Sequence, residues 1–124
     1  MTDAQGRPRL LMLSAGNIND MTMAPDLIEA AAGRFDRLIA DRGYDTNAIR
    51  DAIAAQGAQI VIPSTTSRRA PIPYDRQAYK ARNLVERLWC RLKDWRRIAT
   101  RYDKLARNFL AAALIAATMT FWCY

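Results

Sequence analysis

The 124-residue chain contains no histidine and only two cysteines, Cys90 and Cys123. The absence of histidine excludes the zinc sites that mix histidine with cysteine, and it excludes a histidine-based catalytic triad. The two cysteines are far apart in the sequence and do not have the spacing of a metal-binding pair. We therefore expect both to be small apolar side chains without a disulfide between them.

The chain also lacks the sequence features of export and of membrane insertion. Its first residues contain no basic segment followed by an apolar one, so we expect a cytoplasmic protein. Residues 109–122 carry no charge, but this segment is shorter than the roughly 18–20 apolar residues of a membrane span. A buried final helix over residues 104–120, with no membrane partner, is the favoured interpretation; a basic, membrane-associated helical protein is the weaker alternative.

Acidic residues are scarce in the second half of the chain. Residues 1–67 contain six basic and eight acidic residues, a net charge of −2, whereas residues 68–124 contain thirteen and four, a net charge of +9. Arginine favours phosphate because the guanidinium group makes paired hydrogen bonds to it, and such a surface supplies the sequence-independent part of DNA affinity. The second half therefore indicates DNA as a partner, with a merely soluble basic protein as the alternative.

A long amphipathic helix is predicted around residues 79–93, which contain neither proline nor glycine. Its apolar positions fall on one arc and predict a core-facing stripe: Ala81, Leu84, Val85, Leu88, Leu92 and Trp95. The opposite arc carries Tyr79, Arg82, Glu86 and Lys93. Taken alone, this second arc is typical of a solvated face with an ordinary Arg82–Glu86 pair.

The spacing on that arc, Tyr-x2-Arg-x3-Glu-x6-Lys, resembles the signature around the catalytic glutamate of bacterial insertion-sequence transposases of the DDE class. Tyr79, Arg82, Glu86 and Lys93 match it at every position. Residues 81–87 and 96–106 are also similar to the IS-four/IS-five-type group of that class. The resemblance implies that Glu86 is a catalytic, metal-binding carboxylate and that the other three contact DNA.

A second candidate acid, Asp41, ends a predicted strand over residues 34–41. Gly43 permits a turn into a predicted helix over residues 46–56, and Asp45 precedes this helix as its expected N-cap. Functional groups of α/β sheets gather where strands end, although a plain strand-end acid is the alternative. The segment Asp-Arg-Gly-Tyr also resembles the second catalytic motif of the transposases, which implies that Asp41 is catalytic.

The N-terminus predicts a hairpin, with strands over residues 1–3 and 9–14 and a turn that contains Gly6. On residues alone, Asp3 is an unremarkable acid. The resemblance places it before an Asp-x-x-Gly-x-Pro turn, where the first catalytic aspartate of the family is expected. Most of strand one and a DNA-binding region of the family have no counterpart here, so we expect a C-terminal portion with doubtful activity on its own.

The remaining segments predict a helix over residues 24–33 with Pro25 in its first turn, a strand over residues 59–63, and a mobile connection over residues 64–77. Arg68 and Arg69 in this connection are candidates for gripping a DNA phosphate. A solvated linker is the equal alternative.

Together these expectations describe one domain over residues 1–124, an α/β ribonuclease H-like mixed sheet with flanking helices, truncated in strand one. The resemblance implies that Asp3, Asp41 and Glu86 hold two Mg²⁺ or Mn²⁺ ions for DNA cleavage and strand transfer. It also implies a homo-oligomer when the protein is complete. The alternative function is a catalytically inactive DNA-binding remnant that modulates transposition.

Overall fold

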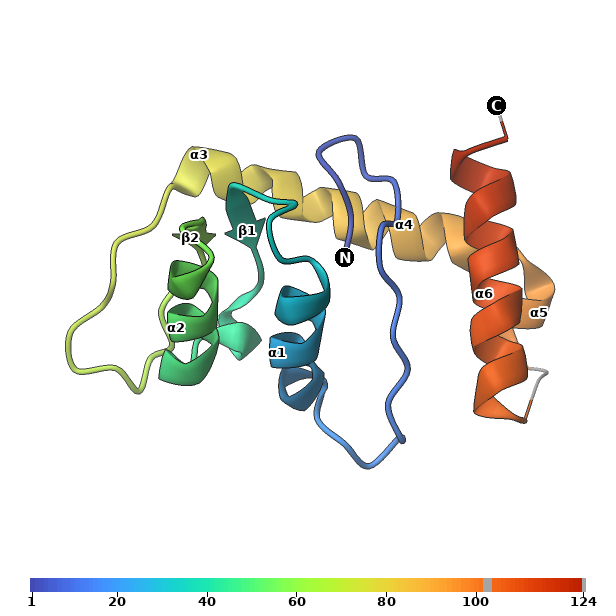
Figure 1. The fold of residues 1–124 in the computed structure, drawn as a ribbon, viewed down its shortest axis with the longest axis horizontal. Coiled ribbons are helices and arrows are strands. Elements are labelled where there is room, and N and C mark those ends of the chain that lie inside the picture. Colours follow the sequence, from blue (N-terminus) through green and yellow to red (C-terminus); the bar gives the residue numbers. More distant parts are fainter. Residues whose placement is uncertain (102–103, 124) are drawn as a thin grey trace. The chain divides into compact units, whose positions relative to one another are not determined.

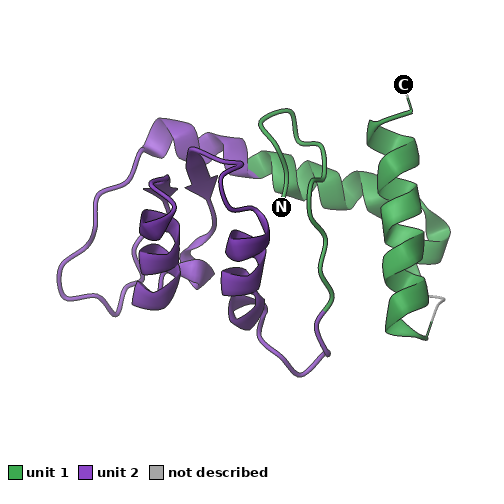
Figure 2. Ribbon diagram, in the orientation of Figure 1, with its two compact units in different colours: residues 1–13, 83–124 green, residues 14–82 purple. Residues whose placement is uncertain are grey.

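The computed structural model describes residues 1–101 and 104–123, so that Tyr102 and Asp103 of the basic segment 96–106 lie outside the described residues. The chain divides into two compact units (Figure 2). Unit 1 comprises residues 1–13 and 83–124, and unit 2 comprises residues 14–82. Helices and strands are both present, so the structure is a mixed α/β arrangement (Figure 1).

Unit 2 contains a strand, helix, strand arrangement in which the two strands are parallel. Residue Arg37 pairs with Gln59, and Ile39 pairs with Val61. The elements are helix α1 (Asp20–Ala30), strand β1 (Arg37–Ile39), the 3-10 helix η1 (Arg42–Tyr44), helix α2 (Asn47–Ala55), strand β2 (Gln59–Val61), helix α3 (Arg76–Tyr79) and the 3-10 helix η2 (Lys80–Arg82). The predicted strands around β1 and β2 and the predicted helix around α2 are confirmed.

The core of unit 2 is built mainly from isoleucine. Ile49 and Ile53 lie four residues apart on α2 and therefore share one face, as do Ala24 and Ile28 on α1. With Ile62, which follows β2, they form one buried cluster. This cluster holds α1 and α2 against the segment where β2 ends.

Helix α1 begins four residues before its predicted start. The side chain of Asn19 accepts a hydrogen bond from the backbone N–H of Met21 at 3.1 Å and so caps the helix there. Pro25 consequently lies inside α1 instead of in its first turn. The missing proline N–H removes a single bond near the start of the helix, so the helix continues to Ala30.

The predicted N-cap of α2 was wrong. Thr46 is the cap, because its hydroxyl oxygen accepts a hydrogen bond from the Ile49 N–H at 3.2 Å. Asp45 is instead a buried residue whose side chain bonds to other segments of unit 2. A carboxylate that is used by two arginines is not available to cap the helix that follows it.

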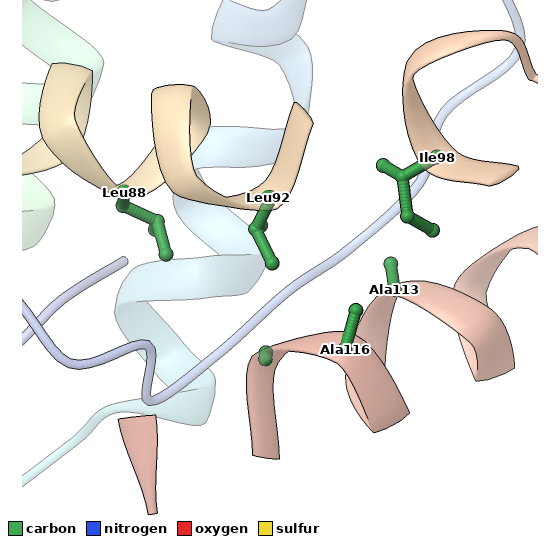
Figure 3. Packing of buried hydrophobic residues seen from close by; sticks show 6 residues of the cluster. Leu88, Leu92, Ile98, Ala113 and Ala116 are labelled. Carbon is green, nitrogen blue, oxygen red and sulfur yellow. The ribbon is translucent and has the colours of Figure 1, made fainter. Parts of the chain in front are cut away.

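Unit 1 is largely helical. Its elements are α4 (Asn83–Lys93), α5 (Arg96–Ala99) and α6 (Ala106–Phe121). Leu88 and Leu92 of α4 lie with Ile98 of α5 in one cluster, to which α6 contributes three buried alanines, Ala113, Ala116 and Ala117 (Figure 3). Alanine lets α6 approach closely, because its side chain adds little bulk between the helices. No helix of the described residues is long and apolar enough to cross a membrane.

The predicted stripe on α4 is confirmed at its centre and wrong at its ends. Leu88 and Leu92 are buried, whereas Ala81 is exposed and Trp95 is 41% exposed. Trp95 lies beyond the end of α4 and forms the N-cap position of α5, so it leaves the helical periodicity. Its indole N–H donates to the Thr120 hydroxyl at 3.0 Å.

The N-terminal hairpin is tighter than predicted and forms no extended strands. Thr2 and Pro8 make an isolated antiparallel bridge, and Gly6 adopts a positive φ of 77° in the turn between them. Hydrogen bonds flank this bridge on both sides, from the Asp3 N–H to the Arg7 carbonyl at 2.9 Å and from the Arg9 N–H to the Met1 carbonyl at 3.0 Å. Leu11, farther along this segment, packs against the apolar cluster of unit 1.

Candidate active site

Asp41 lies just beyond the carboxyl end of β1. The Ala40 N–H donates to the Val61 carbonyl at 3.2 Å, which extends the pairing of the two strands up to this point. One carboxylate oxygen of Asp41, Oδ1, accepts a hydrogen bond from the Gly43 N–H at 2.8 Å and so caps η1. A Cβ on Gly43 would stand only 3.0 Å from that oxygen, so glycine allows the close turn that fixes the carboxylate.

The other oxygen of Asp41, Oδ2, lies 3.4 Å from Nη2 of Arg82. The two side chains are 42% and 34% exposed, so water screens this ion pair and a ligand can reach the carboxylate. Both residues line an open hollow of about 550 Å³, which we call the Asp41 hollow. Its lining residues are Asp41, Arg42, Gly43, Pro63, Tyr74, Tyr79 and Arg82.

The Asp41 hollow brings together three of the residues predicted to be functional: Asp41, Tyr79 and Arg82. It adds two that sequence reasoning missed, Arg42 and Tyr74. Tyr74 packs edge-to-face against Tyr79 with ring centroids 5.5 Å apart. Arg42 carried a signal in the sequence, because it directly follows Asp41, whereas Tyr74 lies in a segment without periodicity.

Asp3 serves as the centre of the N-terminal turn. Its Oδ1 accepts hydrogen bonds from the N–H groups of Gln5 and Arg7, each at 3.0 Å. Its Oδ2 accepts from Nε of Arg7 at 2.9 Å and from Nε of Arg9 at 3.2 Å. Burial alone would raise the pKa of this carboxyl, but the hydrogen bonds from Arg7 and Gln5 outweigh it and hold the pKa below its usual value.

The two arginines that bind Asp3 also contact an aromatic ring. The guanidinium carbons of Arg7 and Arg9 lie 4.6 and 4.8 Å from the ring centroid of Trp122. Asp3 therefore already has four donors, two of them cationic. In this arrangement the carboxylate of Asp3 is not available as a metal ligand, whereas the partly exposed carboxylate of Asp41 is available.

The four residues of the transposase-like signature are divided between the units. Tyr79 and Arg82 belong to unit 2, whereas Glu86 and Lys93 are exposed residues of α4 in unit 1. Within residues 1–101 and 104–123, no group of three or more acidic or cysteine side chains is gathered as a metal site. The convergence of Asp3, Asp41 and Glu86 stays a prediction.

Asp45, which sequence reasoning treated as a helix cap, is the centre of a buried ionic network. Its carboxylate accepts from Nε of Arg50 at 2.6 Å, from the Thr65 N–H at 2.7 Å and from Nε of Arg68 at 2.8 Å. Burial would raise the pKa of Asp45, but these bonds lower it far below its usual value. The network fixes the start of the loop after β2.

The two arginines proposed for phosphate binding differ in their surroundings. Arg68 binds Asp45 and also donates from Nη2 to the Asn47 side chain at 2.9 Å, whereas Arg69 is exposed. The side-chain hydrogen bond to Asp45 raises the pKa of the Arg68 guanidinium. Arg68 therefore has a structural partner, and Arg69 is the more accessible of the two.

In a comparison with known proteins, residues 38–122 match the sequence model of a family described as "Transposase DDE domain". A protein of Brucella ovis, assigned provisionally as the transposase for insertion sequence element IS6501, is 32% identical over 122 residues, covering 96% of this chain and 92% of the relative. A Burkholderia cepacia protein, assigned in the same way to insertion sequence element IS402, is 32% identical over 116 residues, covering 86% of this chain and 53% of the relative. No solved structure matches the chain significantly.

Proposed function

Because the chain belongs to the DDE-domain transposases of insertion sequences, we propose that it takes part in the cleavage and strand transfer of DNA during transposition. The observation that carries this proposal is the position of Asp41. It is an accessible carboxylate at the carboxyl end of a parallel strand, in a hollow that also contains Arg42 and Arg82. A hollow of this composition suits a phosphodiester together with a cation.

We propose Asp41 and Glu86 as carboxylate ligands of divalent metal, Mg²⁺ or Mn²⁺, with two ions in the complete site. Metal held there would supply the positive charge that activates water or a DNA 3′-hydroxyl for attack on phosphorus. Asp3 would join this set only by releasing Arg7 and Arg9, to which its carboxylate is bonded.

The basic residues of the signature would act on the DNA itself. Arg82 beside Asp41 and Lys93 on α4 would bind phosphate oxygens and offset the charge that collects on them in the transition state. Tyr79, which lines the Asp41 hollow, would orient a phosphate through its hydroxyl group. We further propose a ribonuclease H-like fold, a cytoplasmic location, and a homo-oligomer for the complete protein.

The test is a strand-transfer assay with DNA that carries the ends of the insertion sequence, in the presence of Mg²⁺ or Mn²⁺. Asp41→Asn and Glu86→Gln should each reduce strand transfer by roughly 100-fold or more, because each removes a proposed metal ligand. Asp51→Asn is the matched control, since Asp51 is an exposed acid on α2 outside the Asp41 hollow. Full activity in either of the first two variants would refute the assignment.

A second candidate function is a catalytically inactive DNA-binding protein that modulates transposition. The observation that favours it is the carboxylate of Asp3, which four donors already occupy. Both functions include DNA binding, and the affinity for DNA should fall steeply as the salt concentration rises. For each phosphate that the protein neutralises, the logarithm of the association constant should fall by about 0.9 per tenfold increase in salt. Calorimetric titration with Mn²⁺ separates them, because the inactive protein needs no ordered carboxylate site.

A further inference from the structure

We propose that a second hollow in unit 2 binds one unpaired nucleotide of DNA, with the base against Tyr74 and the phosphate on Arg42 and Arg76. The inference rests on the proposed function, since it assumes a DNA partner. We call this the proline-loop hollow. It has a volume of about 430 Å³, and its lining residues are Arg42, Pro63, Ser64, Pro71, Ile72, Pro73, Tyr74 and Arg76.

The wall of the proline-loop hollow is held in place by hydrogen bonds, although the segment was predicted to be a mobile connection. The Ile72 N–H donates to the Ser64 hydroxyl oxygen at 2.7 Å, and that hydroxyl lies 3.3 Å from the Ile72 carbonyl to which it donates. The Thr65 N–H and Arg68 bind the buried carboxylate of Asp45. The loop is therefore anchored at its start and at the point where it returns beside Ser64.

The lining combines an apolar wall with positive charge. Three prolines and Ile72 supply apolar surface, and Tyr74 supplies an aromatic ring whose orientation is fixed by its edge-to-face contact with Tyr79. Arg42 and Arg76 are exposed cations, and none of the acidic residues that the structure describes lines this hollow. The neighbouring carboxylate of Asp75 is engaged at the start of α3, where it accepts from the N–H groups of the two residues after Arg76.

This combination fits a ligand that has both a flat aromatic face and a negative charge, which describes a nucleotide. A base in a duplex hides its faces in the stack, whereas an unpaired base exposes them to an aromatic side chain. Guanidinium groups bind the attached phosphate with paired hydrogen bonds. The proline-loop hollow shares Arg42, Pro63 and Tyr74 with the Asp41 hollow, so a bound nucleotide would lie next to Asp41.

The experiment measures the affinity of the full chain for three fluorescent DNAs by anisotropy at one salt concentration. The first is a blunt duplex, the second is the same duplex with a three-nucleotide thymine tail, and the third has an abasic tail of equal charge. We expect the wild-type chain to bind the thymine tail roughly 5- to 100-fold more tightly than the abasic tail, because only bases can stack.

Three variants and one control locate the effect. Tyr74→Leu should abolish the preference for the thymine tail over the abasic one, and Tyr74→Phe should keep it because the ring is retained. Arg76→Gln should weaken both tails relative to the blunt duplex. Arg69→Gln removes an equal charge from the loop before α3 but outside the hollow, so it should weaken binding of all three DNAs alike and leave the ratios of their affinities unchanged. Circular dichroism confirms that each variant is folded.

Equal binding of thymine and abasic tails by the wild-type chain would overturn the inference, as would a preference that survives in Tyr74→Leu. If the chain binds the blunt duplex and transfers strands but shows no preference for bases, only the inference fails. If the chain binds none of the three DNAs at any salt concentration, the proposed function fails with it.

Discussion

Replacing Asp45 with asparagine should strongly destabilise unit 2. The carboxylate of Asp45 is completely buried, and the side chain of its partner Arg50 is only 9% exposed. Asparagine has nearly the same shape, so it leaves no cavity, but it removes the negative charge and turns one acceptor oxygen into a donor NH₂ group. The positive charge of Arg50 then stays buried without a carboxylate partner, and the Ile62 carbonyl remains as a neutral acceptor.

The expected loss follows from the carboxylate hydrogen bonds that are weakened or removed. Asp45 accepts three hydrogen bonds, two of which come from guanidinium groups. Charge-assisted bonds contribute roughly 1.5–3 kcal/mol each, and removing one partner of a buried ion pair costs about 3–5 kcal/mol. We therefore expect Asp45→Asn to lower the free energy of unfolding by about 3–5 kcal/mol, a large part of the ~5–15 kcal/mol typical of a native protein.

The measurement is urea unfolding followed by circular dichroism, with Asp51→Asn as the matched control on the exposed face of α2. The control should change the free energy of unfolding by less than about 0.5 kcal/mol. Hydrogen exchange gives a local reading, because the Thr65 N–H loses its charged acceptor and should exchange faster in Asp45→Asn. A change below about 1 kcal/mol, with Thr65 still protected, would refute the role of the network.

Two further predictions concern acid sensitivity and the core of unit 1. The pKa of Asp45 is lowered in the folded state, so its contribution to stability is present above the unfolded pKa of about 4 and is lost as the pH falls below that value. The difference in free energy of unfolding between wild type and Asp45→Asn, measured by urea unfolding at several pH values, should therefore shrink below about pH 4. A constant difference from pH 7 to pH 3 would contradict this prediction. Leu92→Ala should lower the free energy of unfolding by about 2–5 kcal/mol, because Leu92 is 0% exposed. Ile115→Ala, at a 63% exposed position, should leave it almost unchanged. Equal losses of stability in thermal or urea unfolding would rule out the described core.

The sequence predicted those parts of the structure that depend on short-range periodicity. The β1, α2, β2 arrangement was predictable because apolar runs, Gly43 and the helical spacing of Ile49 and Ile53 all lie within a short window. The same holds for Leu88 and Leu92. The position of Asp41 was predictable for the same reason, because a strand that ends at a turn places its next residue at the carboxyl end of the strand.

The parts that the sequence did not predict depend on contacts between distant residues. Asp45 stands where an N-cap is expected. Only the tertiary fold brings Arg68 close enough to pair with the buried charge of Asp45. The loop after β2 has no periodicity, so its anchoring through Ser64 and Ile72 had no local signal. Trp95 fits the helical stripe in sequence but lies two residues beyond Lys93, where α4 ends.

Unit 1 joins the beginning of the described chain to its far end, because Trp122 packs against Arg7 and Arg9. During synthesis on the ribosome, residues 1–13 emerge well before α4, α5 and α6 exist. Leu11 and the guanidinium groups of Arg7 and Arg9 therefore have no helical partners until all of unit 2 has been translated. Unit 2 is continuous in sequence, so its contacts can form first, and the closure of unit 1 becomes the late step of folding.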